Sequence, residues 1–237
     1  KTRTYLASII MGLLVPFFFI YLTDLLDTKI HSLVGLEKIV KNVPILGEIP
    51  KLGKKDETLV LKNDRSVLAE SLRILRTNLD YLIRTRQIKN GGESYNNNII
   101  FITSTEPGEG KTFLSSNISM ILASTQKKVL LIGADIRNPK IHSFFPQDKV
   151  NVTTTKSKKD LGLTEYLLNA EMAVKDIVNS LSINENKVDV IYSGRIPPNP
   201  AELLLNERMK HLFEKASKDY DYVVVDTAPL MVVTDTL

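Results

Sequence analysis

The sequence has no cysteine among its 237 residues. This absence excludes disulfide bonds, cysteine-ligated metal sites and a cysteine nucleophile, and it is compatible with a reducing compartment. A dense block of basic residues is also missing: the net charge of +4 is spread along the chain, so nucleic acid is not indicated as a partner. The apolar content of 43% is sufficient for a core, and the length allows one α/β domain plus a smaller segment.

Charge is missing altogether from Tyr5 to Thr23, a run of 19 residues. At 1.5 Å per residue, a helix of this length crosses a hydrocarbon core of about 30 Å. A signal peptide is disfavoured because no cleavage site of small residues follows, and a buried core helix is disfavoured because no polar face appears. Residues 1–27 are therefore predicted to be a transmembrane helix with its flanks. Lys1 and Arg3 precede this segment, but lysines are more numerous after it, which favours a cytoplasmic C-terminal side.

Residues 28–63 are predicted to be a juxtamembrane linker, because Val43 to Pro50 contains two prolines and a glycine. The domain that follows is predicted to occupy 64–237 and to be incomplete at its C-terminal end. It opens with a helix from Ser66, the predicted N-cap, to Gln87, within the segment 64–88. Leucines repeat along one face of this helix. A second, charged stripe contains Glu70, Arg73 and Arg76; on spacing alone it indicates a solvated face rather than a subunit contact.

A strand, a glycine loop and a helix follow one another between residues 99 and 123. The apolar run Ile99–Ile102 predicts a buried strand, and Lys111 and Thr112 stand just before a helix-like run. In such a loop, backbone N–H groups and the helix N-terminus bind phosphate, the lysine reaches the β- and γ-phosphates and the threonine hydroxyl holds Mg²⁺. The Walker A pattern is incomplete at its first position, where Thr105 replaces glycine.

Two aspartates follow later apolar runs. Asp135 lies just past the predicted strand Val129–Ile132, and Asp226 ends the predicted strand Tyr222–Val225 in a Walker B arrangement. The carboxyl ends of parallel strands share one edge of the sheet, where ligands bind. On position alone, Asp135 could equally be a loop cap. Further predictions are helices at 162–168, 173–181 and 201–216, a strand at 188–192, and polar loops at 90–98 and 144–159.

Taken together, these residues make the chain resemble the bacterial tyrosine kinases (BY-kinases) of the Wzc-like exopolysaccharide type. Kinases of this type are also polysaccharide co-polymerases. Its Walker A is similar to the run Glu106–Thr112, and its Walker A′ to the run Leu130–Arg137. The Walker B resembles Val223–Pro229, and the family's Glu-x-x-Arg-x-x-Arg motif matches Glu70, Arg73 and Arg76. The resemblance therefore favours an oligomerisation role for that stripe. It also implies a P-loop NTPase-like α/β fold, with a mostly parallel sheet and flanking helices, preceded by one transmembrane helix.

The resemblance implies an ATP-dependent protein-tyrosine autokinase that regulates capsular or exopolysaccharide polymerisation and export from the bacterial inner membrane, with its kinase domain in the cytoplasm. Its cofactors would be ATP and Mg²⁺. Its partners would be further copies in a ring, its own tyrosine tail in trans, the export machinery and a cognate phosphatase, with no nucleic acid. The implied catalytic residues are Lys111, Asp135 and Asp226, and the implied metal ligands are Thr112, Asp135 and Asp226. The implied nucleotide-binding residues are Glu106, Pro107, Gly108, Glu109, Gly110, Lys111, Thr112 and Phe113.

Two departures from the family pattern stand out: Gly133 replaces the first aspartate of Walker A′, and no tyrosine cluster is present. Two other functions stay open. The first is a MinD/ParA-like ATPase switch, although such proteins usually carry a second lysine where Glu106 stands. The second is a polysaccharide co-polymerase whose ATP site only controls ring assembly, which the loss of a carboxylate at Gly133 favours.

Overall fold

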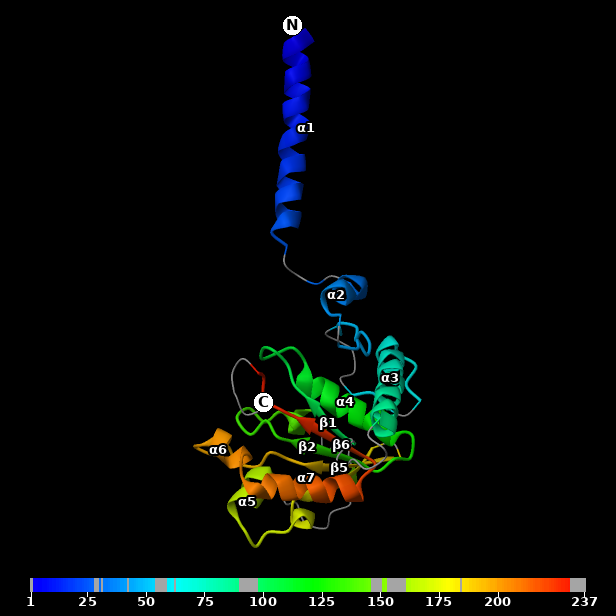
Figure 1. Ribbon diagram of the computed structural model, residues 1–237, viewed down its shortest axis with the longest axis vertical. Coiled ribbons are helices and arrows are strands. Elements are labelled where there is room, and N and C mark those ends of the chain that lie inside the picture. The colour runs from blue at the N-terminus through cyan, green and yellow to red at the C-terminus, as the bar shows by residue number, and fades with distance from the viewer. Residues whose placement is uncertain are drawn as a thin grey trace. The chain divides into compact units, whose positions relative to one another are not determined.

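The computed structural model describes residues 2–27, 30, 32–41, 43–53, 59–61, 63–89, 98–145, 151–152, 161–183 and 185–230. The chain divides into two compact units, 1–45 and 46–237, which are described separately. Figure 1 shows the elements of both. The predicted polar loops at 90–98 and 144–159 fall mostly outside the described residues.

The first unit contains helices α1 (Thr2–Leu25) and α2 (Leu33–Ile39). The expected helix at 5–23 is thus confirmed as a helix, with Pro16 inside it and large apolar side chains exposed along it. In the part of the chain that is described, no helix combines the length and the hydropathy that a membrane crossing requires. The transmembrane interpretation stays a prediction.

The second unit is built on a sheet with the strand order β1-β6-β2-β5-β4-β3 among the described residues. These strands are β1 (Ile99–Ile102), β2 (Val129–Gly133), β3 (Asn151–Val152), β4 (Val178–Ile183), β5 (Asn186–Ile191) and β6 (Tyr222–Asp226). The first four in that order run parallel, and β4 and β3 are antiparallel to their neighbours. The predicted mostly parallel α/β sheet is confirmed.

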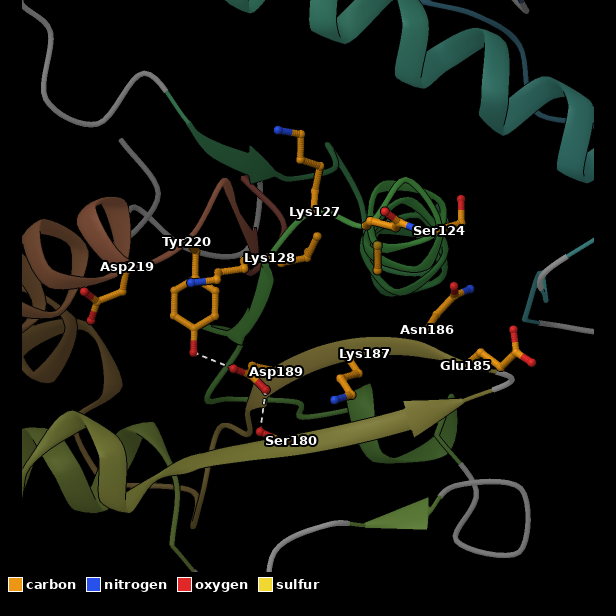
Figure 2. A pocket seen from close by; sticks show the side chains of 13 residues that line it. Ser124, Lys127, Lys128, Ser180, Glu185, Asn186, Lys187, Asp189, Asp219 and Tyr220 are labelled. Carbon is orange, nitrogen blue, oxygen red and sulfur yellow. Dashed lines mark hydrogen bonds between the residues drawn. The ribbon is translucent and has the colours of Figure 1, made fainter.

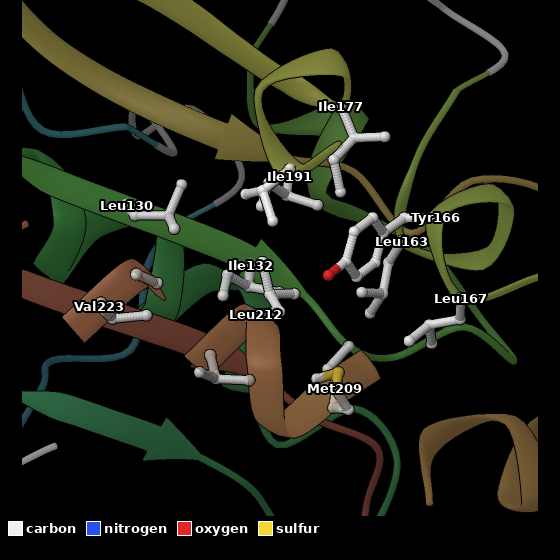
Figure 3. Packing of buried hydrophobic residues seen from close by; sticks show 14 of the residues in the cluster. Leu130, Ile132, Leu163, Tyr166, Leu167, Ile177, Ile191, Met209, Leu212 and Val223 are labelled. Carbon is white, nitrogen blue, oxygen red and sulfur yellow. The ribbon is translucent and has the colours of Figure 1, made fainter. Parts of the chain in front are cut away.

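Helices cover both faces of this sheet, which is why its central strands are apolar without interruption. On one face, Leu130 and Ile132 of β2 pack with α5 (Leu163–Leu168) and α7 (Glu207–Asp219), as Figure 3 shows. On the other face, Val129 and Leu131 pack against α4 (Lys111–Ala123). Successive side chains of β2 therefore belong to opposite cores, as the two-residue period of a strand requires.

Helix α3 (Val67–Lys89) packs against α4 through Leu68 and Leu72. Ser66 caps α3 as predicted, because its hydroxyl accepts a hydrogen bond from the N–H of Ala69. Residues of the predicted linker belong to the same apolar cluster: Ile49, Leu52 and Val60. The linker thus has a packed part within the second unit.

Two predicted helices are wrong in type or extent. Residues 173–181 form only a 3₁₀ turn (Val174–Asp176) and then strand β4, in which alternate side chains are buried against the neighbouring layers. The predicted helix 201–216 is two helices, α6 (Pro200–Leu204) and α7. The break is at Asn206, which has extended backbone geometry and whose side chain caps α7 by accepting from the N–H of Arg208.

Candidate nucleotide-binding site

The loop between β1 and α4 has the conformation that phosphate binding needs. Gly108 and Gly110 have φ angles of 94° and 95°, in the left-handed region that side chains with a Cβ avoid. Gly110 is the N-cap residue of α4, and it has no side chain to occupy the first N–H groups of that helix. These donors and the positive end of the helix dipole are therefore available to an anion.

Lys111 and Asp135 form an ion pair at the carboxyl edge of the sheet. Lys111 Nζ lies 2.7 Å from Asp135 Oδ2, and both side chains are largely buried. The second carboxylate oxygen of Asp135 accepts a hydrogen bond from the N–H of Asn138 at 3.0 Å. Phosphate groups that bind Lys111 must therefore compete with Asp135 for its ammonium.

Thr112 and Asp226 form the second pair. The Thr112 hydroxyl donates to Asp226 Oδ2 at 2.8 Å, and both side chains are buried. The other oxygen of Asp226, Oδ1, is buried without a hydrogen-bond partner among the described residues. A buried unpartnered carboxylate oxygen beside a threonine hydroxyl fits a Mg²⁺ ion, which takes oxygen ligands in such sites.

The pKa of Asp226 is raised to about 6. Burial is the main cause, because it penalises the charged form. The hydrogen bond from Thr112 and the charge of Lys111 oppose this rise, while the charge of Asp135 adds to it. At neutral pH the group is thus a poorly solvated carboxylate that a cation would stabilise.

Backbone hydrogen bonds hold the two aspartates in register. The N–H groups of Ala134 and Asp135 both donate to the carbonyl oxygen of Asp226, at 2.8 and 3.0 Å. Past the end of β6, Thr227 donates its N–H and its hydroxyl to the carbonyl oxygen of Ile102. The loops after β1, β2 and β6 are therefore tied together, so that the predicted residues Lys111, Thr112, Asp135 and Asp226 meet at one edge.

Gly133 leaves room for Ser193, a residue that the sequence did not indicate. A Cβ built on Gly133 would lie 2.8 Å from Ser193 Oγ and 3.0 Å from the side chain of Ile141. Ser193 is buried, and its hydroxyl donates to the carbonyl oxygen of Asp135 at 3.2 Å. The position of the missing carboxylate is thus packed, and the hydroxyl supports the backbone of the aspartate that remains. No local motif signals this contact, because it joins residues 58 apart.

The charged stripe lies on α3, away from the four site residues along the chain. Arg73 forms an ion pair with Glu70 at 2.5 Å and donates to the carbonyl oxygen of Asp64 at 2.6 Å. Two members of the Glu70, Arg73 and Arg76 set are therefore engaged within the chain. The solvated-face interpretation and the oligomerisation interpretation both remain compatible with this geometry.

A cavity of about 710 Å³ lies at the opposite edge of the sheet, near the start of β2 and the end of β4 (Figure 2). Asp189 accepts hydrogen bonds there from the hydroxyls of Tyr220, at 2.7 Å, and Ser180, at 2.6 Å. Burial, above all, raises the pKa of Tyr220, and the bond to Asp189 adds to the rise. Because ligands of parallel sheets bind at the carboxyl edge, this cavity is not the nucleotide site.

Known proteins resemble the chain along most of its length. Residues 97–236 match the family described as AAA domain. Tyrosine-protein kinase YwqD of Bacillus subtilis is 37% identical over 75% of this chain, and tyrosine-protein kinase wzc of Salmonella typhimurium is 29% identical over 99%. The solved kinase domain of the Escherichia coli tyrosine kinase ETK has a TM-score of 0.68 and 30% identity, covering 86% of this chain and 75% of that one.

The chain belongs to the bacterial tyrosine kinase family. The resemblance stated from the motifs is thereby confirmed. The chain spans 65% of the length of YwqD and 32% of that of wzc. The kinase relatives therefore extend well beyond the region that they share with this chain.

Proposed function

We propose that the chain is an ATP-dependent protein-tyrosine kinase. The observation that carries this proposal is the meeting of two polar pairs, Lys111 with Asp135 and Thr112 with Asp226, beside a loop with the conformation of a phosphate site. Phosphoryl transfer is catalysed mainly by positioning and by stabilisation of charge, and these four residues supply both.

In the proposed reaction, the N–H groups at the start of α4 bind the phosphates, and Lys111 moves from Asp135 to the transferring phosphoryl group. Asp135, released from that ion pair, accepts the proton of the acceptor tyrosine hydroxyl as the oxygen attacks phosphorus. The bond from phosphorus to the bridging oxygen of ADP then breaks, and ADP leaves. When Lys111 leaves Asp135 for the phosphate, nucleotide binding thus frees Asp135 to act as the general base.

Mg²⁺ would be held by Thr112 Oγ1 and Asp226, since both are oxygen ligands and Asp226 Oδ1 lacks another partner among the residues described. When bound, the ion neutralises charge on the β- and γ-phosphates. Thr112 and Asp226 would hold it near the start of α4, because Thr112 is in the first turn of that helix.

The wider role follows the family. We propose that the chain is part of an autokinase that phosphorylates its own tyrosine tail between subunits of a ring, at the bacterial inner membrane, in control of capsule or exopolysaccharide export. The export machinery and a phosphatase would be its partners. The uncharged run Tyr5–Thr23 within α1, whose large apolar side chains are exposed, supports membrane attachment. Alkaline extraction of membranes tests it: the chain should stay in the pellet, and release into the supernatant would refute attachment.

The kinase proposal is tested with the whole chain, Mg-ATP and a tyrosine-containing copolymer as acceptor, read out as phosphotyrosine. We expect the parent to phosphorylate the copolymer, and Lys111→Ala to lose at least about 100-fold, because charge stabilisation is lost. Asp135→Asn should lose about 10²- to 10⁴-fold in transfer, as expected for a proton acceptor, yet keep ATP affinity. Chelation of Mg²⁺ should abolish transfer.

The rival functions predict other results. A parent that binds Mg-ATP without forming phosphotyrosine would favour the assembly-switch reading, with Gly133 as its structural reason. Full activity in Lys111→Ala would contradict the phosphate site itself. Equal transfer by Asp135→Asn and the parent would contradict the role of Asp135 while leaving the kinase proposal standing.

A further inference from the structure

The side chain of Glu109 closes the phosphate loop on itself. Its Oε2 accepts hydrogen bonds from the N–H groups of Thr105, at 2.8 Å, and Glu106, at 3.2 Å. One carboxylate oxygen therefore ties the residue just before the Gly110 cap to the first two positions of the Walker A pattern, Thr105 and Glu106. Ser104 secures the same entry, because its hydroxyl donates to the carbonyl oxygen of Glu106 at 2.8 Å.

This loop has a particular need for such a tie. The usual first glycine is replaced by Thr105, and Pro107 has no N–H to contribute a bond across the loop. The left-handed glycines at 108 and 110 bend the backbone, and glycine is also the residue that loses most conformational freedom when it is ordered. A hydrogen-bonded link across the loop offsets that cost before any ligand arrives.

We propose that Glu109 is a positioning residue that holds the phosphate loop in the conformation that binds nucleotide. This inference rests on the proposed nucleotide-binding function and deepens it. The carboxylate uses the N–H groups of Thr105 and Glu106, so phosphate binding is assigned to the N–H groups of the glycine turn and of Lys111. Glu109 itself makes no contact with the reacting atoms.

Charge and hydrogen bonding act in opposite directions at this position. A carboxylate in a loop that receives phosphates repels them, so removal of its charge alone should favour binding. Removal of the acceptor oxygen should disfavour binding, because the loop loses its tie. Glutamine keeps a carbonyl acceptor on a chain of the same length but carries no charge, whereas alanine lacks both. The two substitutions therefore separate the two effects.

The experiment measures the dissociation constant of Mg-ATP by calorimetry for the whole chain, its Glu109→Ala variant and its Glu109→Gln variant. We expect Glu109→Ala to bind about 5- to 20-fold more weakly, and Glu109→Gln to bind within twofold of the parent or more tightly. In the copolymer assay, Glu109→Ala should raise the KM for ATP more than it lowers kcat. Thermal unfolding of each variant confirms that it is folded.

Each alternative gives a different result. Equal or tighter binding by Glu109→Ala would overturn the proposal, since charge would then outweigh the tie. Binding by Glu109→Gln that is as weak as that of Glu109→Ala would also overturn it, because the acceptor oxygen would be irrelevant. A parent that does not bind Mg-ATP would overturn the proposed function as well, whereas a binding parent with an unaffected Glu109→Ala variant overturns this inference alone.

Discussion

At the scale of single residues, the site is organised by competition for partners. Lys111 is held by Asp135, and Thr112 by Asp226, so each group that a nucleotide or a cation would bind already has a partner. The exception among the described atoms of these four residues is Asp226 Oδ1, which is buried without one. The site without ligands is therefore held by hydrogen bonds, and Asp226 is the carboxylate whose charge is least compensated.

The raised pKa of Asp226 predicts that the stability of the folded chain depends on pH. The pKa of Asp226 is about 6 in the folded chain and close to 3.9 when unfolded. The folded state binds the proton of Asp226 more tightly than the unfolded state does. Protonation of Asp226 therefore stabilises the folded state, fully below pH 3.9, and this stabilisation is lost as the pH rises through 6. We expect the metal-free parent to lose about 2 kcal/mol relative to Asp226→Asn between pH 4 and pH 7.

Urea denaturation in EDTA, at several pH values, measures this difference between the two chains. Other titrating groups are shared, so their contributions cancel in the comparison. A constant difference across this range would show that Asp226 has an ordinary pKa. With nucleotide present, the affinity of the parent for Mg²⁺ should fall below pH 6, because the protonated acid is a poor ligand.

At the scale of elements, α4 connects the phosphate loop to the chain that precedes the domain core. Asn117, fully buried on α4, accepts a hydrogen bond from the N–H of Val60 at 2.7 Å and donates to the carbonyl oxygen of Phe113 at 2.9 Å. Tyr222 adds a link between β6 and α3 through its bond to Asp80 at 2.7 Å. The middle of α4 is thus bonded to Val60, which lies 57 residues earlier in the chain.

Asn117→Ala should therefore loosen the segment around Val60. The backbone N–H of Val60 would be left buried without an acceptor, which costs about 1–3 kcal/mol. We expect unfolding free energy to fall by that amount and hydrogen exchange of the Val60 amide to accelerate. Asn78→Ala is the control, since the exposed Asn78 loses one bond to the carbonyl oxygen of Leu46 and should change stability by less than about 0.5 kcal/mol. Unchanged exchange at Val60 would refute the link.

The elements also show what sequence could predict. The strands β1, β2 and β6 are short apolar runs, and the site residues next to them follow from the strand-loop-helix order. The segment 173–181 was mispredicted because Val174, Ile177, Val178 and Leu181 have helical spacing, although pairing with β5 places the last two of them in strand β4. Ser193 and the Glu109 link were missed because they depend on contacts across loops, which periodicity does not record.

At the scale of the whole molecule, assembly is the open prediction. Arg73 is engaged inside the chain by Glu70 and by the carbonyl oxygen of Asp64. If the stripe joins subunits, Arg76 should carry the larger share of the contact. We expect Arg76→Glu to weaken self-association at least tenfold, because like charges would then face one another across subunits.

Sedimentation velocity over a concentration series measures this change. Arg84→Glu is the matched control, because it makes the same charge reversal two turns further along α3, outside the motif, and should leave self-association unchanged. Equal sedimentation of parent and Arg76→Glu would argue for a solvated face. An equal loss in both variants would indicate a general effect of charge on α3.

The packing at Gly133 also limits how the site can evolve. A side chain at this position would collide with Ser193 and Ile141, which belong to two other segments of the chain. An aspartate here therefore requires the Ser193 hydroxyl to turn away and the Ser193 backbone nitrogen, 3.2 Å from the added Cβ, to shift slightly. Gain of the second carboxylate and rearrangement of Ser193 must occur together, so the two positions should covary across lineages as a pair. In a graft between relatives, they should be exchanged as one unit.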